Sequence, residues 1–404
     1  MNATPDADSL RAGLVDLLAA RGTVRTAPVE AALRAVPRHV FIPDIELQAA
    51  YAPDDAVVTK RDPAGIALSS ASAPGIVAAM LEQLDVRPGH TILEIGAGTG
   101  YNAALLAELT GPGGRVVTID IDADVAAGAR AALAAAGHGQ VDVRIADGAD
   151  GYAPGGPYDR IIVTAGAWDL PPAWWQQLAP DGRLVVPLRV TGGTTRSIAF
   201  GRRDGHLVSQ SMIPCGFLAM RGICSHPEPT VPLADGVQLL LGDGRTAPPE
   251  RLARALTKPA ARTWIPVTIR SGQPLHDLDL WLATTSRGFC RIIAQPSAVE
   301  TDLATPAFRW NGAAVTNGTD SFAYLTIRPV DQAGRDETCY QLGVRAHGPR
   351  RGDLTAALTE QILRWDKGHR AATPRIEARL KPAQITAGMV IDKPCTLLAV
   401  TWPP

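Results

Sequence analysis

Apolar residues in the first part of the chain recur at the spacing of helices. Between residues 9 and 36 they return every three or four positions, with a break near Gly22, which predicts two short helices. A third helical run extends from Ile76 to Leu84. It follows Pro74, and proline is favoured in the first turn of a helix, so Ala73 is the expected cap residue.

From residue 91 onward, short apolar runs alternate with helical runs. The predicted strands are TILEI at 91–95, RVVTID at 115–120, and then VDVRIAD, YDRIIVTAG and GRLVVPL; the predicted helices are YNAALLAEL and VAAGARAALAAAG. Strands that alternate with helices of this length form a mostly parallel sheet covered on both faces, with ligands at the carboxyl ends of the strands. We therefore predict an α/β fold with a doubly wound, Rossmann-like domain.

The pattern changes beyond about residue 235. Short strand-like segments separated by Gly, Pro and Asn turns follow, with one helix at 353–366. The predicted strands are TWIPVTIR, DLWLAT, CRIIA, FRWNG, SFAYLTIRP, YQLGVRAHG and TLLAVTW. We expect three parts: residues 1–75 as an N-terminal helical and acceptor-pocket segment, 76–235 as the α/β core, and 236–404 as a C-terminal β-rich α+β domain.

The composition is that of a globular protein and argues against several kinds of function. Of 404 residues, 46% are hydrophobic and 20% charged, and the net charge is −1, so neither nucleic acid nor an anionic membrane is an expected partner. The cysteines form no CxxC pair and the histidines show no metal-ligand spacing, so we expect no metal. The N-terminus lacks a signal-peptide pattern, and no apolar run reaches the ~18 residues of a membrane span, so we expect a cytoplasmic location.

A glycine-rich turn, EIGAGTG, joins the first predicted strand of the core to the next helix. It begins at Glu94 and contains Gly96, Gly98 and Gly100, which allow a tight turn and the close approach of a ligand. A dinucleotide fingerprint, GxGxxG, would need glycine where Tyr101 stands, whereas GxGxG is typical of S-adenosylmethionine sites. By itself, such a turn can also be a plain connection between a strand and a helix.

Two acidic positions follow at the ends of the next predicted strands. Asp120 ends the second strand, close to the ~20-residue separation from Gly96 at which a carboxylate meets ribose hydroxyls. After the third strand, IADGAD places Asp147 and Gly148 where a carboxylate and a close backbone can hold adenine. The turn and both acidic positions together predict a binding site for S-adenosylmethionine.

Several segments around this turn resemble one family in sequence and in order. They are VPRHVFIP at 36–43, AYAPDDAV at 50–57, SAP at 72–74, VRPGHTILEIGAGTGYNAALLAEL, VVTID, ADGADGY and PYDRIIVTAGA. Over roughly residues 8–220 the chain resembles the protein L-isoaspartate O-methyltransferases. The resemblance implies an S-adenosylmethionine-dependent enzyme that methylates a carboxyl group of an aspartyl or isoaspartyl residue in a peptide or protein.

The family carries a Thr-Ile-Ser-Gln-Pro sequence whose serine lies at the methyl-acceptor pocket. Aligned on Pro74, this serine falls on Ser72, the threonine on Ser70 and the glutamine on Ala73. The resemblance implies that Ser72 orients the acceptor carboxylate in a catalytic role, with Ser70 and Ser69 beside it. From composition alone, the favoured interpretation of the same serines is that they cap a helix or belong to a solvated loop.

Two departures from the family concern the acceptor. The segment VVTKRDPAGIALSS replaces its glycine-rich Pro-Ile-Gly sequence, and we expect Lys60 and Arg61 there to guide the peptide. The C-terminal region, 236–404, is the second departure, and it resembles the branch encoded with lanthipeptides and related ribosomal peptides. That branch methylates an aspartate in a modified precursor peptide, and the ester cyclises to a succinimide that opens to isoaspartate. The alternatives are a protein-repair isoaspartate methyltransferase and a non-catalytic peptide-binding module on the same scaffold.

His39 and three tryptophans each allow two interpretations. For His39, in VPRHVF, we favour a structural hydrogen bond over a catalytic role. Trp168, Trp174 and Trp175 are suited either to line the site or to pack helices.

Overall fold

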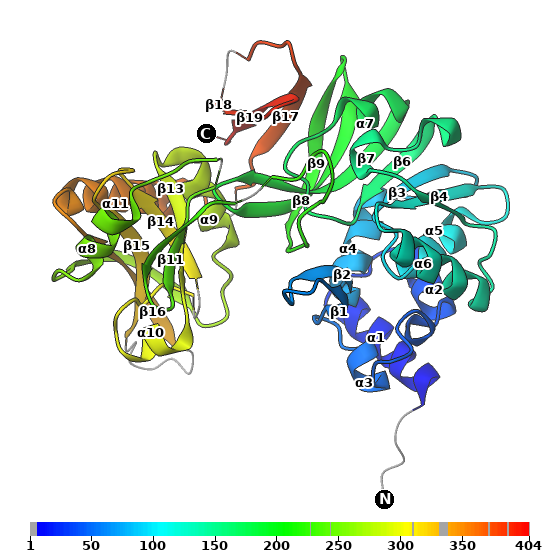
Figure 1. Ribbon diagram of the computed structural model, residues 1–404, viewed down its shortest axis with the longest axis horizontal. Helices are drawn as coiled ribbons and strands as arrows, with labels where there is room; N and C mark the ends of the chain where they lie inside the picture. The colour runs from blue at the N-terminus through cyan, green and yellow to red at the C-terminus, as the bar shows by residue number, and fades with distance from the viewer. Residues whose placement is uncertain are drawn as a thin grey trace, which may run out of the picture.

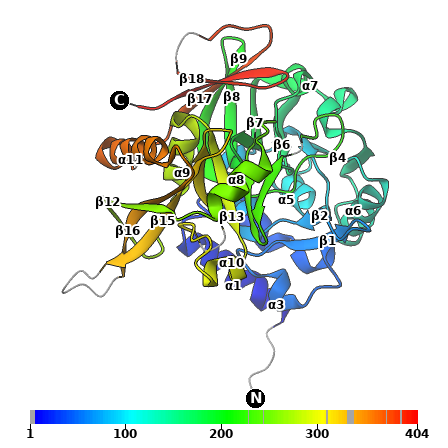
Figure 2. The same ribbon diagram turned by 60° about the vertical axis from the view of Figure 1, so that its left-hand side comes forward.

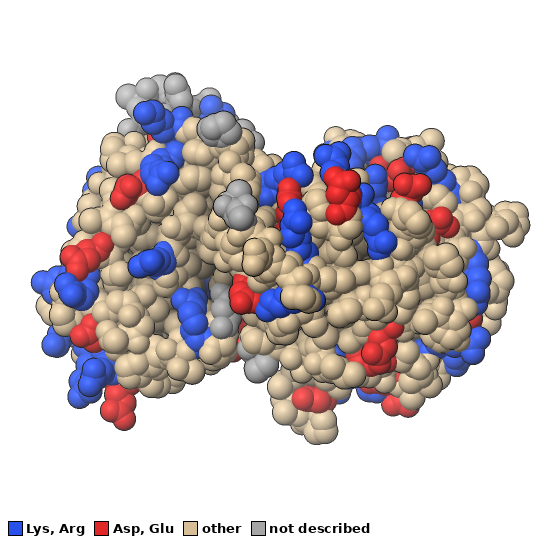
Figure 3. Space-filling model, turned by 90° about the horizontal axis from the view of Figure 1, so that it is seen from above, with Lys and Arg blue, Asp and Glu red and all other residues tan. Residues whose placement is uncertain are grey.

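The computed structural model describes residues 6–226, 228–242, 244–308, 311–330, 338–370, 372–385 and 388–403, and these form two lobes (Figure 1). The chain builds one lobe up to about residue 214 and the other between residues 230 and 368, and its last strands return to the first lobe. Seen from above, acidic and basic side chains are interspersed on both lobes (Figure 3). In the described part of the chain, no helix combines the length and apolar character needed to cross a membrane.

The first lobe begins with helices and a hairpin. They are α1 Ala7–Ala20, α2 Ala27–Ala35, the 3-10 helix η1 Arg38–Phe41, α3 Leu47–Ala50, and the antiparallel strands β1 Val57–Arg61 and β2 Ala67–Ala71. The two helices predicted between residues 9 and 36 are thus confirmed. Helix α4, Pro74–Leu84, starts at the predicted proline, with Ala73 as its cap residue. The polar stretch before it is therefore a strand followed directly by a helix start.

A parallel sheet follows, as the alternation of strands and helices predicts. Its strands are β3 Thr91–Ile95, β4 Arg115–Asp120, β5 Asp142–Ile145, β6 Tyr158–Val163 and β7 Leu178–Thr191, and the intervening helices are α5 Tyr101–Thr110, α6 Ala123–Ala135, η2 Gly148–Asp150, η3 Ala153–Gly155 and α7 Pro172–Gln177. The spatial order β5-β4-β3-β6-β7 confirms the doubly wound Rossmann-like fold. The order reverses between β3 and β6, and ligands of such sheets bind at that point.

Antiparallel strands extend this sheet on the side of β7. Strands β8 Thr194–Arg203 and β9 His206–Pro214 come first, and β17 Arg375–Leu380, β19 Thr396–Thr401 and β18 Met389–Asp392 pair beyond them to complete ten strands. Asp169 accepts hydrogen bonds from the backbone N–H of Cys395 and the hydroxyl of Thr396. The end of the chain is therefore fastened to the first lobe.

The second lobe is built on a separate antiparallel sheet of seven strands, in the order β10-β11-β13-β14-β15-β16-β12. The strands are β10 Thr230–Ala234, β11 Val237–Leu240, β12 Ala261–Arg270, β13 Phe289–Ala294, β14 Asn311–Thr316, β15 Phe322–Val330 and β16 Cys339–His347. The helices are α8 Pro249–Leu256, α9 His276–Thr285, α10 Pro296–Glu300 and α11 Arg351–Gly368. The sheets do not divide the chain at residue 235, because β10 begins before residue 236 and β17 to β19 join the sheet of the first lobe. The division of the chain at residues 75 and 235 stays a prediction.

One predicted strand of this lobe is wrong, and two residues of another lie outside the described residues. DLWLAT lies inside α9, because Leu278, Trp281 and Leu282 recur at helical spacing and are all buried there. FRWNG includes residues 309 and 310, which the structure does not describe, and its last two residues begin β14. The other five predicted strands and the helix at 353–366 are confirmed.

Candidate active site

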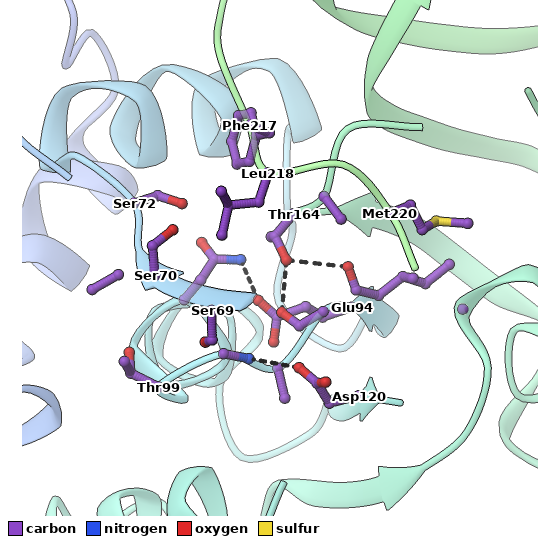
Figure 4. A pocket seen from close by; sticks show the side chains of 18 of the residues that line it. Ser69, Ser70, Ser72, Glu94, Thr99, Asp120, Thr164, Phe217, Leu218 and Met220 are labelled. Carbon is purple, nitrogen blue, oxygen red and sulfur yellow. Dashed lines mark hydrogen bonds between the residues drawn. The ribbon is translucent and has the colours of Figure 1, made fainter. Parts of the chain in front are cut away.

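A pocket lies at the carboxyl ends of β3, β4 and β6, where the strand order of the first sheet reverses (Figure 4). Its walls come from η1, β2, the turn between β3 and α5, the ends of β4 and β6, and the loop after β9. Figure 4 shows Ser69, Ser70 and Ser72 on one side, with Asp120 and Met220 on the other. After the roles that the sequence predicts, we call the first side the acceptor half, formed by Ser69, Ser70 and Ser72, and the second side the donor half, formed by the glycine turn and Asp120.

The glycine turn requires glycine for two different reasons. Gly96, Gly98 and Gly100 have φ angles of +105°, +52° and +88°, which side chains rarely tolerate. A Cβ on Gly96 would lie 2.5 Å from the Oγ1 atom of Thr164, whose hydroxyl donates to the Gly96 carbonyl at 2.6 Å. A Cβ on Gly98 would meet only the Ser70 carbonyl within 4 Å, at 3.7 Å, so this position faces open space in the pocket.

Gly100 has a packing role. A Cβ there would lie 3.1 Å from both the Ala129 carbonyl and Leu133 of α6. Gly96 and Gly98 line the pocket, whereas Gly100 is absent from its lining and lets α5 pack closely on α6.

Asp120 is held in the pocket by the backbone. Its two oxygens accept from the N–H of Gly98 at 3.2 Å and from the N–H of Asp122 at 3.0 Å. Arg221 approaches the same carboxylate to 3.9 Å. Because a carboxylate has about four lone-pair sites, it keeps acceptor capacity for a vicinal diol, as a ribose requires. The residues present therefore fit the nucleoside part of S-adenosylmethionine.

The two residues predicted after β5 are placed differently. Gly148 lines the pocket, and its carbonyl accepts from the indole N–H of Trp174 at 2.8 Å. The carboxylate of Asp147 instead accepts from the N–H groups of Ala149 and Ile223, each at 2.9 Å. Asp147 is not in the pocket lining and holds the loop after β9, so its contact with adenine stays a prediction.

Glu94 lines the pocket beneath the turn and is fully buried, and its contact with the cofactor stays a prediction. It accepts hydrogen bonds from the Asn102 amide at 2.7 Å and the Thr118 hydroxyl at 2.6 Å. Burial raises the pKa of Glu94 to about 7, although both hydrogen bonds act in the opposite direction. Glu94 thereby joins β3, β4 and α5 beneath the donor half.

The three serines all line the pocket from β2 and the residues after it. The Ser69 hydroxyl accepts from the hydroxyl of Thr59 at 3.1 Å, across the hairpin. For the hydroxyls of Ser70 and Ser72, the described residues provide no hydrogen-bond partner. Since Ala73 is the cap residue of α4, Ser72 is not used as a cap. The catalytic role of the serines stays a prediction.

Lys60 and Arg61 lie outside the pocket lining, on β1. The Lys60 ammonium pairs with Asp122 at 2.8 Å and Asp124 at 3.0 Å, which joins the hairpin to the start of α6 (Figure 2). Arg61 donates to the Gly65 carbonyl within the hairpin at 2.8 Å. Both side chains thus have local partners, and their role in guiding the peptide stays a prediction.

Sequence reasoning missed several residues of the pocket. Arg38 is next to His39, which has the structural role that we favoured, since its Nδ1 atom lies 2.8 Å from the Tyr51 hydroxyl. Phe217, Met220 and Arg221 come from the loop after β9, which has no periodic pattern and no resemblance motif. Only the folded chain brings them to the glycine turn.

Comparison with known proteins agrees with this geometry. The protein-family model described as protein-L-isoaspartate(D-aspartate) O-methyltransferase matches residues 9–222. The chain is 38% identical over 220 residues to the protein-L-isoaspartate O-methyltransferase of Methanopyrus kandleri, covering 54% of this chain and 94% of that protein. It is 44% identical over 195 residues to the enzyme of the same name from Methanoregula boonei, covering 48% and 84%.

One solved structure is similar over almost the whole chain. It is named protein-L-isoaspartate O-methyltransferase, is 21% identical, and covers 91% of this chain and 96% of its own, with a TM-score of 0.51. At this identity the likeness concerns the fold, and its extent includes the second lobe.

Proposed function

The chain belongs to the protein-L-isoaspartate(D-aspartate) O-methyltransferase family, and from this premise we propose that it methylates an aspartyl side chain in a ribosomally synthesised, modified precursor peptide. It is an S-adenosylmethionine-dependent methyltransferase. In this proposal the methyl ester closes to a succinimide, which opens to isoaspartate. The second lobe recognises the precursor peptide.

One observation carries the proposal: donor and acceptor elements share a single pocket. Gly98 and Asp120 on one side and Ser70 and Ser72 on the other line the same pocket. A methyl donor and a carboxylate bound on these two sides would meet in it. Reacting groups that are held in place in this way gain several kcal/mol relative to free encounter, about 7 to 11 in favourable cases.

The chemistry asks little of the protein beyond positioning. S-adenosylmethionine supplies an electrophilic methyl group on a sulfonium sulfur. An aspartyl carboxyl has a pKa near ~4 in water and is already ionised at neutral pH, so no strong general base is needed. The serine hydroxyls donate hydrogen bonds that orient the carboxylate, and the walls of the pocket replace water around it.

The departures at the acceptor half favour a modified peptide over general repair. Ala73 stands where the family resemblance expects glutamine, and the β1–β2 hairpin replaces the glycine-rich sequence before it. The second lobe does not separate the two substrates by itself, because the solved structure that covers 91% of this chain has the repair enzyme's name. The hairpin sequence therefore supports a modified peptide substrate more strongly than the second lobe does.

A second candidate function is repair of isoaspartyl residues in proteins, which the names of the relatives favour. A non-catalytic binding module is a weaker alternative, since the pocket keeps both the glycine turn and Asp120. Absence of a heat signal on titration with millimolar S-adenosylmethionine would exclude both enzymatic functions.

Steady-state kinetics with two peptides separate the enzymatic functions. Methyl transfer from labelled S-adenosylmethionine is measured with the cyclised precursor encoded beside this chain and with a short isoaspartyl peptide. The proposal predicts a kcat/KM at least tenfold higher for the precursor. Equal or higher kcat/KM for the simple isoaspartyl peptide would favour repair and contradict the proposal.

A further inference from the structure

Arg38 is a buried cation among the residues that line the pocket. It lies in η1, lines the same pocket as the three serines, and is only 1% exposed. Its Nε atom donates to the Ala50 carbonyl at 2.8 Å, and its guanidinium lies 5.0 Å from the centre of the Tyr101 ring. These two contacts hold the side chain in one position.

The rest of its hydrogen-bonding capacity is unused. Neither Nη1 nor Nη2 has a hydrogen-bond partner among the described residues, and no carboxylate among them pairs with this guanidinium. Burial lowers the pKa of Arg38, but arginine remains charged in proteins. Because buried charges are normally paired, an unpaired guanidinium in a pocket wall indicates an anion that the protein itself does not provide.

Another buried arginine of the same lobe shows the contrast. Arg160 is 7% exposed, and its guanidinium donates to the backbone carbonyls of Leu84, Asp85 and Asp159. It lies outside the pocket lining. Arg160 is thus satisfied by carbonyl groups, whereas Arg38 has one such contact and two nitrogens without a partner among the described residues.

We propose that Arg38 binds the peptide carboxylate that receives the methyl group. This inference rests on the proposed methyl transfer and identifies the group that draws the acceptor into the pocket. A carboxylate has about four lone-pair sites, so pairing with the two guanidinium nitrogens and one serine hydroxyl leaves a lone pair for the attack.

The change of charge during methyl transfer also affects how tightly Arg38 binds the substrate and the product. The carboxylate oxygen forms a bond to the methyl carbon while the carbon–sulfur bond breaks; the sulfonium becomes a neutral thioether, the carboxylate becomes a neutral ester, and no proton moves. The ester no longer pairs with the guanidinium. Arg38 therefore binds the substrate more tightly than the product, which favours release after each turnover.

A double-mutant cycle between protein and peptide tests this pairing. The full chain, saturated with S-adenosylhomocysteine to prevent turnover, is titrated with the pentapeptide Ala-Gly-isoAsp-Gly-Ala and with its α-carboxamide analogue. The cyclised precursor and its counterpart with asparagine at the methylated aspartate form a parallel pair. For each pair that binds, wild type is expected to bind the carboxylate peptide at least tenfold more tightly than its neutral analogue. Arg38→Met should reduce this ratio of affinities to about one.

Two further variants separate loss of the carboxylate contact from loss of stability. Arg160→Met removes a buried arginine outside the pocket and should lower stability while leaving the tenfold ratio intact. If Arg38→Met does not fold, Arg38→Lys takes its place and should give a ratio between one and the wild-type value. A ratio equal to that of wild type in the folded Arg38 variant would overturn the inference.

The outcome also separates this inference from the proposed function. If wild type methylates a peptide but its carboxylate preference does not depend on residue 38, the inference alone fails. If wild type transfers methyl groups to neither peptide, the proposed function fails, and the inference fails with it.

Discussion

The donor and acceptor halves of the pocket differ in how far the protein itself satisfies their polar groups. In the donor half, Asp120 accepts from two backbone N–H groups, and Glu94 beneath it accepts from two side chains. No described residue makes a hydrogen bond with the half-buried Ser72 hydroxyl of the acceptor half, and the terminal nitrogens of Arg38, which also lines the pocket, are buried without a partner there. Unmade hydrogen bonds are costly when buried. The donor half is therefore organised in advance, whereas we propose that a bound ligand completes the acceptor half.

This difference separates the expected effects of substitutions. Changes in the donor half should alter stability and donor affinity, because its groups are part of a connected backbone framework. Changes in the acceptor half should alter turnover and peptide affinity with little effect on the folded protein.

Glu94→Gln should give the largest effect. Burial raises the pKa of Glu94 to about 7 from the usual 4.5, so between these values the folded state holds a proton that the unfolded state has lost. Wild-type stability then falls as pH rises through this window. The side chain of the variant stays neutral and does not contribute this loss. Between pH 4.5 and 7, the unfolding free energy of the variant minus that of wild type should therefore increase with pH, by up to about 3 kcal/mol.

Urea unfolding at pH 5 and pH 8 measures this difference. Glu46→Gln is the matched control, because this carboxylate is exposed and no described residue forms an ion pair with it, so its loss should not change the difference in this way. A variant-minus-wild-type difference that is the same at both pH values would contradict a protonated Glu94 beneath the turn.

Asp120→Ala should weaken S-adenosylmethionine binding by about 1 to 3 kcal/mol, the scale of hydrogen bonds to a charged group. Calorimetric titration checks the dissociation constant. Asp124→Ala is the control, since that carboxylate is 90% exposed and pairs with Lys60 at the hairpin. Equal donor affinity in the Asp120 variant and wild type would remove Asp120 from the donor half.

Ser72→Ala should lower kcat roughly fivefold, about 1 kcal/mol, because one orienting hydrogen bond to the acceptor is lost. Donor affinity should stay at the wild-type value. Ser69→Ala should have a smaller effect, since that hydroxyl is already bonded to Thr59. Unchanged turnover in the Ser72 variant would show that this hydroxyl does not orient the acceptor.

Lys60→Ala should have the smallest effect, less than twofold on the peptide KM, because its ammonium already pairs with Asp122 and Asp124 and lies outside the pocket lining. Kinetics at low salt give the most sensitive measurement. A tenfold or larger rise in KM would instead show that Lys60 contacts the peptide.

The donor half could be predicted from sequence because a contiguous turn and the ends of neighbouring strands define it. Gly96, Gly98, Asp120 and Gly148 all line the pocket. The glycine spacing could not show that Gly100 serves helix packing, because that depends on how closely α6 approaches. Likewise, the partner of Asp147 lies in a loop that is distant in the sequence.

The acceptor half and the second lobe were harder to predict. Arg38 belongs to a motif that we quoted, but its unpaired nitrogens become visible only when the surrounding chain is in place. The return of β17 to the first sheet depends on pairing with β9, far apart in sequence, which local periodicity does not encode. The segment DLWLAT was misassigned because a short apolar run suits a buried helix as well as a strand.

Mapping the methyl group by mass spectrometry tests the central claim most directly. The cyclised precursor and its aspartate-to-asparagine variant are incubated with the full chain and S-adenosylmethionine. The account predicts a methyl ester or succinimide at that one aspartate and no modification of the variant peptide. Methylation of a simple isoaspartyl peptide, with an unmodified precursor in the same reaction, would contradict it.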